Sequence, residues 1–131
     1  MSQLAQQIQQ YMSEYSEAGG DELTARFLFP AEFIGFQGHF PGRPILPAVC
    51  KIQAAVVMLE TWKRGSVILN EVVLAKFAAP VGCDEELLLR CLVTMEDDER
   101  AVVKASVAKG DKSVAKFKLR VTFENQGVGC S

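Results

Sequence analysis

One segment concentrates the residues that could do chemistry. It runs from Gly38 to Pro47 and reads Gly-His-Phe-Pro-Gly-Arg-Pro-Ile-Leu-Pro. It contains His39, the only histidine of the chain, and three of the five prolines. Because proline fixes φ and removes a backbone donor, this spacing predicts a stiff, non-helical loop. Imidazole titrates near neutral pH, so a histidine in such a loop can accept a proton.

An apolar segment follows the loop, from Pro47 to about Lys63. Proline is favoured at the first helical position, so we expect Pro47 to open a helix that ends at Gly65-Ser66. The segment is apolar almost all round, which predicts a buried helix. Its first turn presents free backbone N–H groups and the positive end of the helix dipole beside the loop. Loop and helix start together predict a functional site.

Two further elements are expected before this loop. Leu4, Ile8, Tyr11 and Tyr15 recur at helical spacing, which predicts a short amphipathic helix closed by Gly19-Gly20 that packs over the core. Apolar and polar residues then alternate from residue 23 to residue 29, which predicts a strand ending at Pro30.

After Gly65 the apolar residues recur with period two. This pattern predicts strands near 66–77, 85–95, 100–108 and 112–124, with hairpin turns at 96–99 and 109–112. One buried helix and a long antiparallel sheet leave few architectures, so we expect the sheet to wrap the helix while the N-terminal helix covers an open end. The predicted fold class is α+β, in a single domain over residues 1–131.

Composition excludes several classes of function. The 16 acidic residues exceed the 14 basic ones, and we see no basic stripe with interleaved aromatic residues, so nucleic-acid binding is not expected. No apolar run approaches the roughly 18 residues that span a bilayer, and the N-terminus lacks the features of a signal peptide. The four cysteines form no CxxC pair and no metal-binding spacing with His39. We expect reduced thiols in a cytoplasmic protein, without metal or cofactor.

Two motifs carry a resemblance to a known family. Residues 37–49, Gln-Gly-His-Phe-Pro-Gly-Arg-Pro-Ile-Leu-Pro-Ala-Val, resemble the G-H-F-P-G-x-P-x-x-P-G-V motif of FabZ-type 3-hydroxyacyl-acyl-carrier-protein dehydratases. Residues 75–81, Ala-Lys-Phe-Ala-Ala-Pro-Val, look like the K-F-x-x-P-V strand of the same family. The order of elements agrees from roughly Leu23 to Phe123.

The resemblance implies a hot-dog fold, in which a sheet wraps a long central helix. It implies a homodimer, or a trimer of dimers, with the acyl tunnel along the subunit interface. The implied substrate is a thioester of acyl carrier protein or coenzyme A, in fatty acid or related acyl-chain metabolism. The surface of a carrier protein is acidic, and Lys51, Lys63, Arg64 and Lys76 could meet it.

The resemblance also implies roles for individual residues. His39 matches the general base that removes the C2 proton of the acyl thioester. The amides around Ala48 and Val49 match the position that polarises the thioester carbonyl, although Ala48 stands where the family has glycine. The implied substrate-binding residues are Gly38, Phe40, Pro41, Gly42, Pro47, Ala48 and Val49.

Gln53 departs from the family pattern. It occupies the position of the acidic residue that, in the family, the partner subunit supplies to protonate the departing 3-hydroxyl. An amide cannot deliver that proton, and general acid catalysis is typically worth about 10²–10⁴ in rate. Gln53 could instead orient the hydroxyl or a water.

Three functions stay open. The first and preferred one is a dehydratase-like lyase with His39 as base and Gln53 in its site. The second is a hot-dog thioesterase, in which the helix N-terminus stabilises an oxyanion formed by attack of water. The third is a non-catalytic acyl-thioester-binding protein that keeps the fold and the tunnel.

Overall fold

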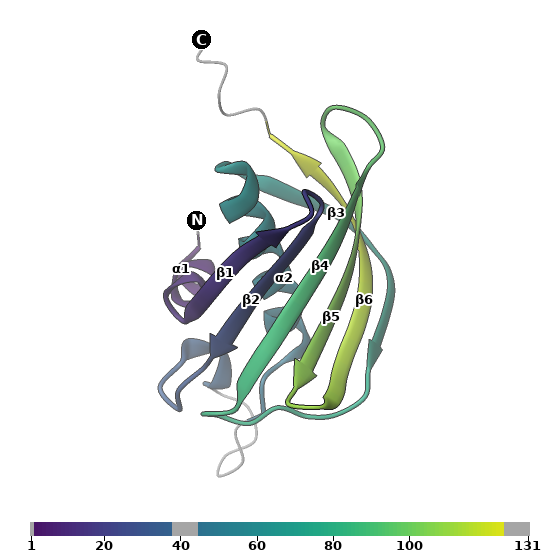
Figure 1. The fold of residues 1–131 in the computed structure, drawn as a ribbon. Coiled ribbons are helices and arrows are strands. Elements are labelled where there is room, and N and C mark those ends of the chain that lie inside the picture. The colour runs from purple at the N-terminus through teal and green to yellow at the C-terminus, as the bar shows by residue number, and fades with distance from the viewer. Residues whose placement is uncertain (1, 38–44, 125–131) are drawn as a thin grey trace.

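A six-stranded antiparallel sheet curves around one long helix (Figure 1). The computed structural model describes residues 2–37 and 45–124. The strand order is β1-β2-β4-β5-β6-β3, so β1 and β3 form the two edges. The elements are α1 (Gln3–Gln10), β1 (Met12–Ala18), β2 (Glu22–Leu28), the 3₁₀ helix η1 (Ile34–Phe36), α2 (Ala48–Lys63), β3 (Val67–Phe77), β4 (Glu86–Met95), β5 (Arg100–Lys109) and β6 (Lys112–Phe123).

Alternating apolar residues build the face of the sheet that packs on α2. In β6, Phe117, Leu119 and Val121 are buried while Lys116 and Arg120 are exposed, as the period-two pattern predicts. Strands β2, β4 and β5 alternate in the same way. The predicted strands after residue 65 and both hairpin turns are therefore confirmed within one or two residues.

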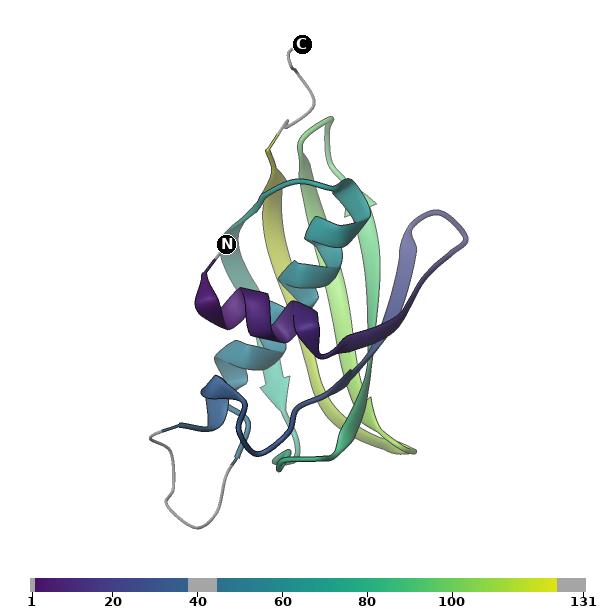
Figure 2. The same ribbon diagram turned by 90° about the vertical axis from the view of Figure 1, so that its left-hand side faces the viewer.

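The predicted N-terminal helix is wrong beyond Gln10. Helix α1 covers two turns, with Ser2 as N-cap and Ala5 and Ile8 buried, and Tyr15 lies in strand β1. The chain pairs with β2 because aromatic side chains favour a pleated surface and the pairing satisfies the strand backbone. Helix α1 packs against α2 beside the β1–β2 end of the sheet (Figures 1 and 2), so the expected cover exists but is short.

The central helix is confirmed, with a correction at its start. Pro47 is the N-cap, with extended φ and ψ of -64° and 152°, and Ala48 is the first helical residue. The helix ends where Arg64 adopts the left-handed conformation at φ 55°. Residues 54–59 of α2 are buried, as the apolar sequence predicts. No helix in the described ranges is both long and apolar enough to cross a membrane.

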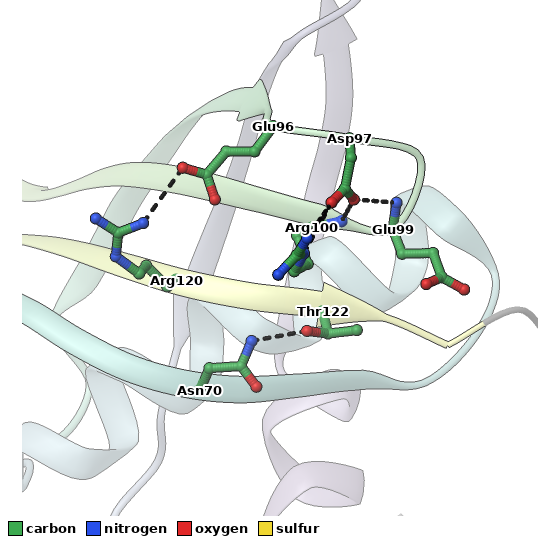
Figure 3. Close-up of polar contacts among 7 residues, drawn as sticks. All are labelled: Asn70, Glu96, Asp97, Glu99, Arg100, Arg120 and Thr122. Atoms are coloured by element: carbon green, nitrogen blue, oxygen red, sulfur yellow. Dashed lines mark hydrogen bonds and ion pairs between the residues drawn. The ribbon is translucent and has the colours of Figure 1, made fainter.

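The outer face of the sheet is polar toward the β4–β5 turn. There the carboxylate of Asp97 accepts hydrogen bonds from the backbone N–H groups of Glu99 and Arg100 and pairs with the Arg100 guanidinium (Figure 3). Arg120 of β6 bonds Glu96 across the sheet in the same view. The acidic run 96–99 is thus a hydrogen-bonded turn on the surface, as predicted.

Edge strand β3 is unusual because it is exposed on both faces. Leu69 and Val72 lie opposite the buried residues Val121 and Leu119 of β6, so they point toward the inner face, yet they are 39% and 41% exposed. Six of the ten exposed large apolar side chains among the described residues belong to this strand. Strand β3 therefore leaves an apolar edge of the sheet uncovered by the rest of the described chain.

Candidate functional site

The start of α2 presents accessible backbone at the predicted site. Ala48 and Val49 are exposed, Val49 by 59%. The first N–H groups of a helix have no intrahelical acceptor, so these amides are available to a ligand. Ala48 is helical and is not among the residues with positive φ. Its methyl group therefore causes no backbone strain where the family has glycine.

A cavity of about 390 Å³ lies at this helix start. Its lining comes from two segments that are distant in sequence: Ile45, Leu46, Pro47, Ala48 and Lys51 on one side, Phe77, Ala78, Ala79 and Pro80 on the other. The backbone N–H of Leu46 donates to the carbonyl of Val81 at 2.7 Å, which joins the two segments. The described end of the first motif, residues 45–48, therefore meets the second motif at one cavity.

Lys51 is a site residue whose burial the sequence analysis missed. It is only 4% exposed, and its Nζ donates to the carbonyl of Leu46 at 3.2 Å. The same atom lies 5.6 Å from the ring centroid of Phe77. Burial lowers the pKa of the Lys51 ammonium, since desolvation disfavours the charged form. The available signal was a lysine within a helical segment that is mostly apolar.

Gln53 lies one helical turn beyond Val49, on the same side of α2. It is half-buried, and its side chain forms no hydrogen bond with another described residue. Part of the Gln53 side chain therefore remains exposed beside Val49.

The predicted site residues Gly38, His39, Phe40, Pro41 and Gly42 lie outside the described residues. The described chain before them is held in place by η1, where the backbone N–H of Ile34 donates to Oε1 of Gln7 at 3.0 Å.

η1 also packs tightly on the first turn of α2. A Cβ added at Gly35 would lie 2.8 Å from Sγ of Cys50 and still closer to the ring of Phe33. The 3₁₀ helix η1 and the first turn of α2 are therefore in direct contact.

The cysteines give no sign of redox or metal chemistry in the described part of the chain. Burial raises the pKa of the Cys50 thiol to about 11 and that of Cys91 to about 12. Such thiols carry little thiolate and are poor nucleophiles. Within residues 2–37 and 45–124, no three His, Cys, Asp or Glu side chains gather as metal ligands.

Comparison with known families identifies the chain. The model of the ApeI-like family, described as ApeI dehydratase, matches residues 15–118. The chain belongs to the ApeI-like dehydratase family. A curated relative, the 3-hydroxyacyl-[acyl-carrier-protein] dehydratase FabZ of Clostridium acetobutylicum, is 32% identical over 96 residues. The match covers 67% of this chain and 66% of that relative, just under two thirds of its length.

Solved structures of other family members and of more distant proteins confirm the hot-dog fold. The dehydratase heterocomplex ApeI:P from Xenorhabdus doucetiae matches with a TM-score of 0.70 at 19% identity, covering 85% of this chain and 96% of that one. A putative thioesterase, yhdA, from Lactococcus lactis matches with a TM-score of 0.71 at 10% identity, covering 96% and 99%. At these identities the similarity establishes the fold alone.

Proposed function

We propose that this ApeI-like protein eliminates water from 3-hydroxyacyl thioesters. The observation that carries the proposal is the family match over residues 15–118. Residues 45–48 and 77–80, the described parts of the two sequence motifs, border the cavity at the start of α2. The accessible amides of Ala48 and Val49 support it, because the reaction requires donors to the thioester carbonyl.

The proposed reaction is a proton-balanced elimination. His39 takes the C2 proton, the electron pair forms the C2–C3 double bond, and the C3–O bond breaks as the hydroxyl leaves with a proton as water. The amides at the start of α2 stabilise the negative charge that develops on the thioester oxygen. Gln53 orients the leaving hydroxyl, and the proton comes from the protonated His39, either directly or through a water that Gln53 holds and that His39 reprotonates.

The proposed site requires a second chain. The inner face of β3 is apolar and uncovered, and the Gln53 side of α2 is open, which supports pairing through this edge. A homodimer satisfies both surfaces. Because one structural neighbour is a dehydratase heterocomplex, a related chain with a carboxylate at the position of Gln53 is the alternative partner. The carrier, acyl carrier protein or coenzyme A, also belongs to the proposal.

The test is incubation of the purified protein with a 3-hydroxyacyl thioester and, in the reverse direction, with the matching enoyl thioester. We expect the enoyl absorbance to change in both directions, and His39→Ala to abolish the change. Release of free thiol would identify a thioesterase instead, a reading for which the yhdA similarity supplies only a shared fold. Saturable binding with no reaction would identify a non-catalytic binding protein.

A further inference from the structure

The outer face of the sheet carries a groove that the proposed chemistry does not use. Its volume is about 350 Å³. Leu74 and Leu92 form apolar patches within it, and they are 66% and 46% exposed. The other lining residues are Lys76, Arg90, Lys104, Ala105, Ser106, Lys116, Phe117 and Lys118. The groove is therefore an apolar depression bordered by positive side chains.

The strand register places the lysines of this groove in like-charge pairs. Lys76 of β3 lies directly opposite Lys116 of β6, and Lys104 of β5 lies directly opposite Lys118 of β6. Directly opposite residues have Cβ atoms about 4.5–5.5 Å apart, and like charges at that spacing destabilise a sheet. These two lysine pairs do not stabilise the fold. A role in binding a negatively charged partner would explain why they are there.

Two arginines of the outer face, including Arg90 of the groove itself, form ion pairs within the chain. Arg120 pairs with Glu71 and Glu96, the second contact visible in Figure 3, and Arg90 pairs with Glu22. The four groove lysines (Lys76, Lys104, Lys116 and Lys118) form no ion pair with any residue in the described ranges. The chain as a whole carries a net charge of -2, so this cluster is a local concentration of positive charge.

We infer that this lysine groove docks an acidic protein, the carrier that delivers the acyl thioester, and the inference rests on the proposed function. A partner face with carboxylates around an apolar side chain complements both the ammonium groups and the two exposed leucines. A nucleotide phosphate would neutralise the lysine ammonium groups but would leave Leu74 and Leu92 exposed.

The position of the groove supports delivery to the site. Successive strand residues point to opposite faces of a sheet, and Lys76 lines the groove while its neighbour Phe77 lines the cavity at the start of α2. A carrier seated in the groove therefore holds its thioester arm beside the end of the sheet, where residues 78–80 border the cavity. Of the four basic residues considered for this contact from sequence, Lys76 alone lines the groove.

The experiment compares one 3-hydroxyacyl chain on three handles: a purified acyl carrier protein, coenzyme A and N-acetylcysteamine. We expect Lys104→Glu to lower kcat/KM about tenfold or more for the carrier-bound substrate, with the other two within about twofold of the unsubstituted protein. Lys112→Glu, the same charge change at an exposed lysine that lines neither the groove nor the cavity, is the matched control, and all three kcat/KM values should stay within about twofold of the unsubstituted protein. Lys118→Gln, which only neutralises, should lower the carrier value less.

Other results would overturn the inference. An equal loss with the coenzyme A ester and not with N-acetylcysteamine would mean that the groove binds phosphate groups. A smaller molecular mass for Lys104→Glu than for the unsubstituted protein, measured by light scattering, would mean that the groove binds a second copy of the chain. If the protein turns over no thioester, the proposed function fails, and fluorescence anisotropy with a labelled carrier protein still tests the docking: binding that Lys104→Glu leaves unchanged refutes it. Thermal melts verify that each variant is folded.

Discussion

Gln53 lies on the accessible side of α2, one turn beyond the exposed Val49. Its amide is, besides Ala48, the departure of this chain from the family pattern that the sequence analysis describes. Because an amide cannot act as a general acid, Gln53 decides how fast the proposed elimination can run. Its accessibility means that a carboxylate can replace it without a large desolvation penalty.

We predict that Gln53→Glu raises the rate of dehydration and of the reverse hydration by about 10²–10⁴, the usual contribution of a general acid. The measurement is the initial rate of enoyl absorbance change with one thioester in both directions. Gln53→Asn is the matched control, since it keeps an amide and should show no gain. A Gln53→Glu variant that binds acyl thioester normally yet stays inert would show that the site lacks more than an acid.

Lys51 shows what residue types alone could not reveal about the site. A lysine in a helix is expected at a solvated surface, and the sequence analysis placed Lys51 among residues that could meet a carrier. Its burial depends on the Leu46 carbonyl and the Phe77 ring, which belong to the entering loop and to the edge strand. Periodicity along the helix contains no information on those long-range partners.

At the level of elements, η1 packs directly on the first turn of α2. Gly35 is required there because Phe33, which is fully buried, and Cys50 occupy the space that any side chain would take. The contact joins the chain just before the His39 segment to the first turn of the helix that would bind the thioester carbonyl.

We predict that Gly35→Ala lowers the free energy of unfolding by about 1–3 kcal/mol, the usual cost of overpacking. Urea denaturation measures the change. Cys50→Ala removes one of the two clashing groups, so the double substitution should cost less than the sum of the single ones. Strict additivity would mean that the alanine methyl is accommodated without pressing on Cys50.

The β4–β5 turn makes the free energy of unfolding depend on pH in the acidic range. Hydrogen bonds from the backbone N–H of Glu99 and from Arg100 lower the pKa of Asp97 from 3.8 to about 2. A depressed pKa in the folded state stabilises the protein above the unfolded value of 3.8, and the contribution is lost as pH falls toward 2.

We therefore expect Asp97→Asn to destabilise the protein at about pH 5 and to cost progressively less as the pH falls toward 2. Urea denaturation across that range provides the measurement. Asp98→Asn is the control, because the Asp98 carboxylate forms no hydrogen bond with a described residue, and it should change little at either pH. A cost for Asp97→Asn that does not vary with pH would contradict the assignment.

Sequence periodicity predicted most of the helices and strands correctly. It predicted the N-terminal helix only up to Gln10. The sheet strands after residue 65 alternate strictly because one face packs on α2 and the other meets solvent. The segment around Tyr15 fits helical spacing equally well, so its state depends on pairing with β2, a tertiary effect that local pattern does not contain. The sequence likewise did not show that β3 would be exposed on both faces.

At the level of the whole molecule, the proposed site is divided between two chains. In that arrangement, His39 of one chain works with residue 53 of its partner. A complete pair consists of the base His39 and a carboxylic acid at residue 53. The unsubstituted chain has the base but not the acid. The double substitution His39→Ala and Gln53→Glu gives a chain with the acid but not the base.

We predict that mixing these two chains under conditions that exchange subunits gives a higher dehydratase activity than either chain shows alone. Random pairing gives one complete site in half of the dimers, so about a quarter of the Gln53→Glu rate is expected. The enoyl assay on the mixture, before and after exchange, measures it. A mixture that never exceeds the sum of its components would place base and acid on the same chain, or the chain in a partnership with another protein.

The irregular register of β3 has a consequence for how such a partner is selected. Breaks between Leu69 and Glu71 and between Val72 and Leu74 interrupt its ladder with β6. A flat apolar edge would accept any extended peptide and could grow into fibrils, whereas a twice-bulged strand fits only a neighbour with matching distortions. The two bulges therefore restrict which strands can pair with the apolar edge of β3, and they oppose open-ended polymerisation of the protein.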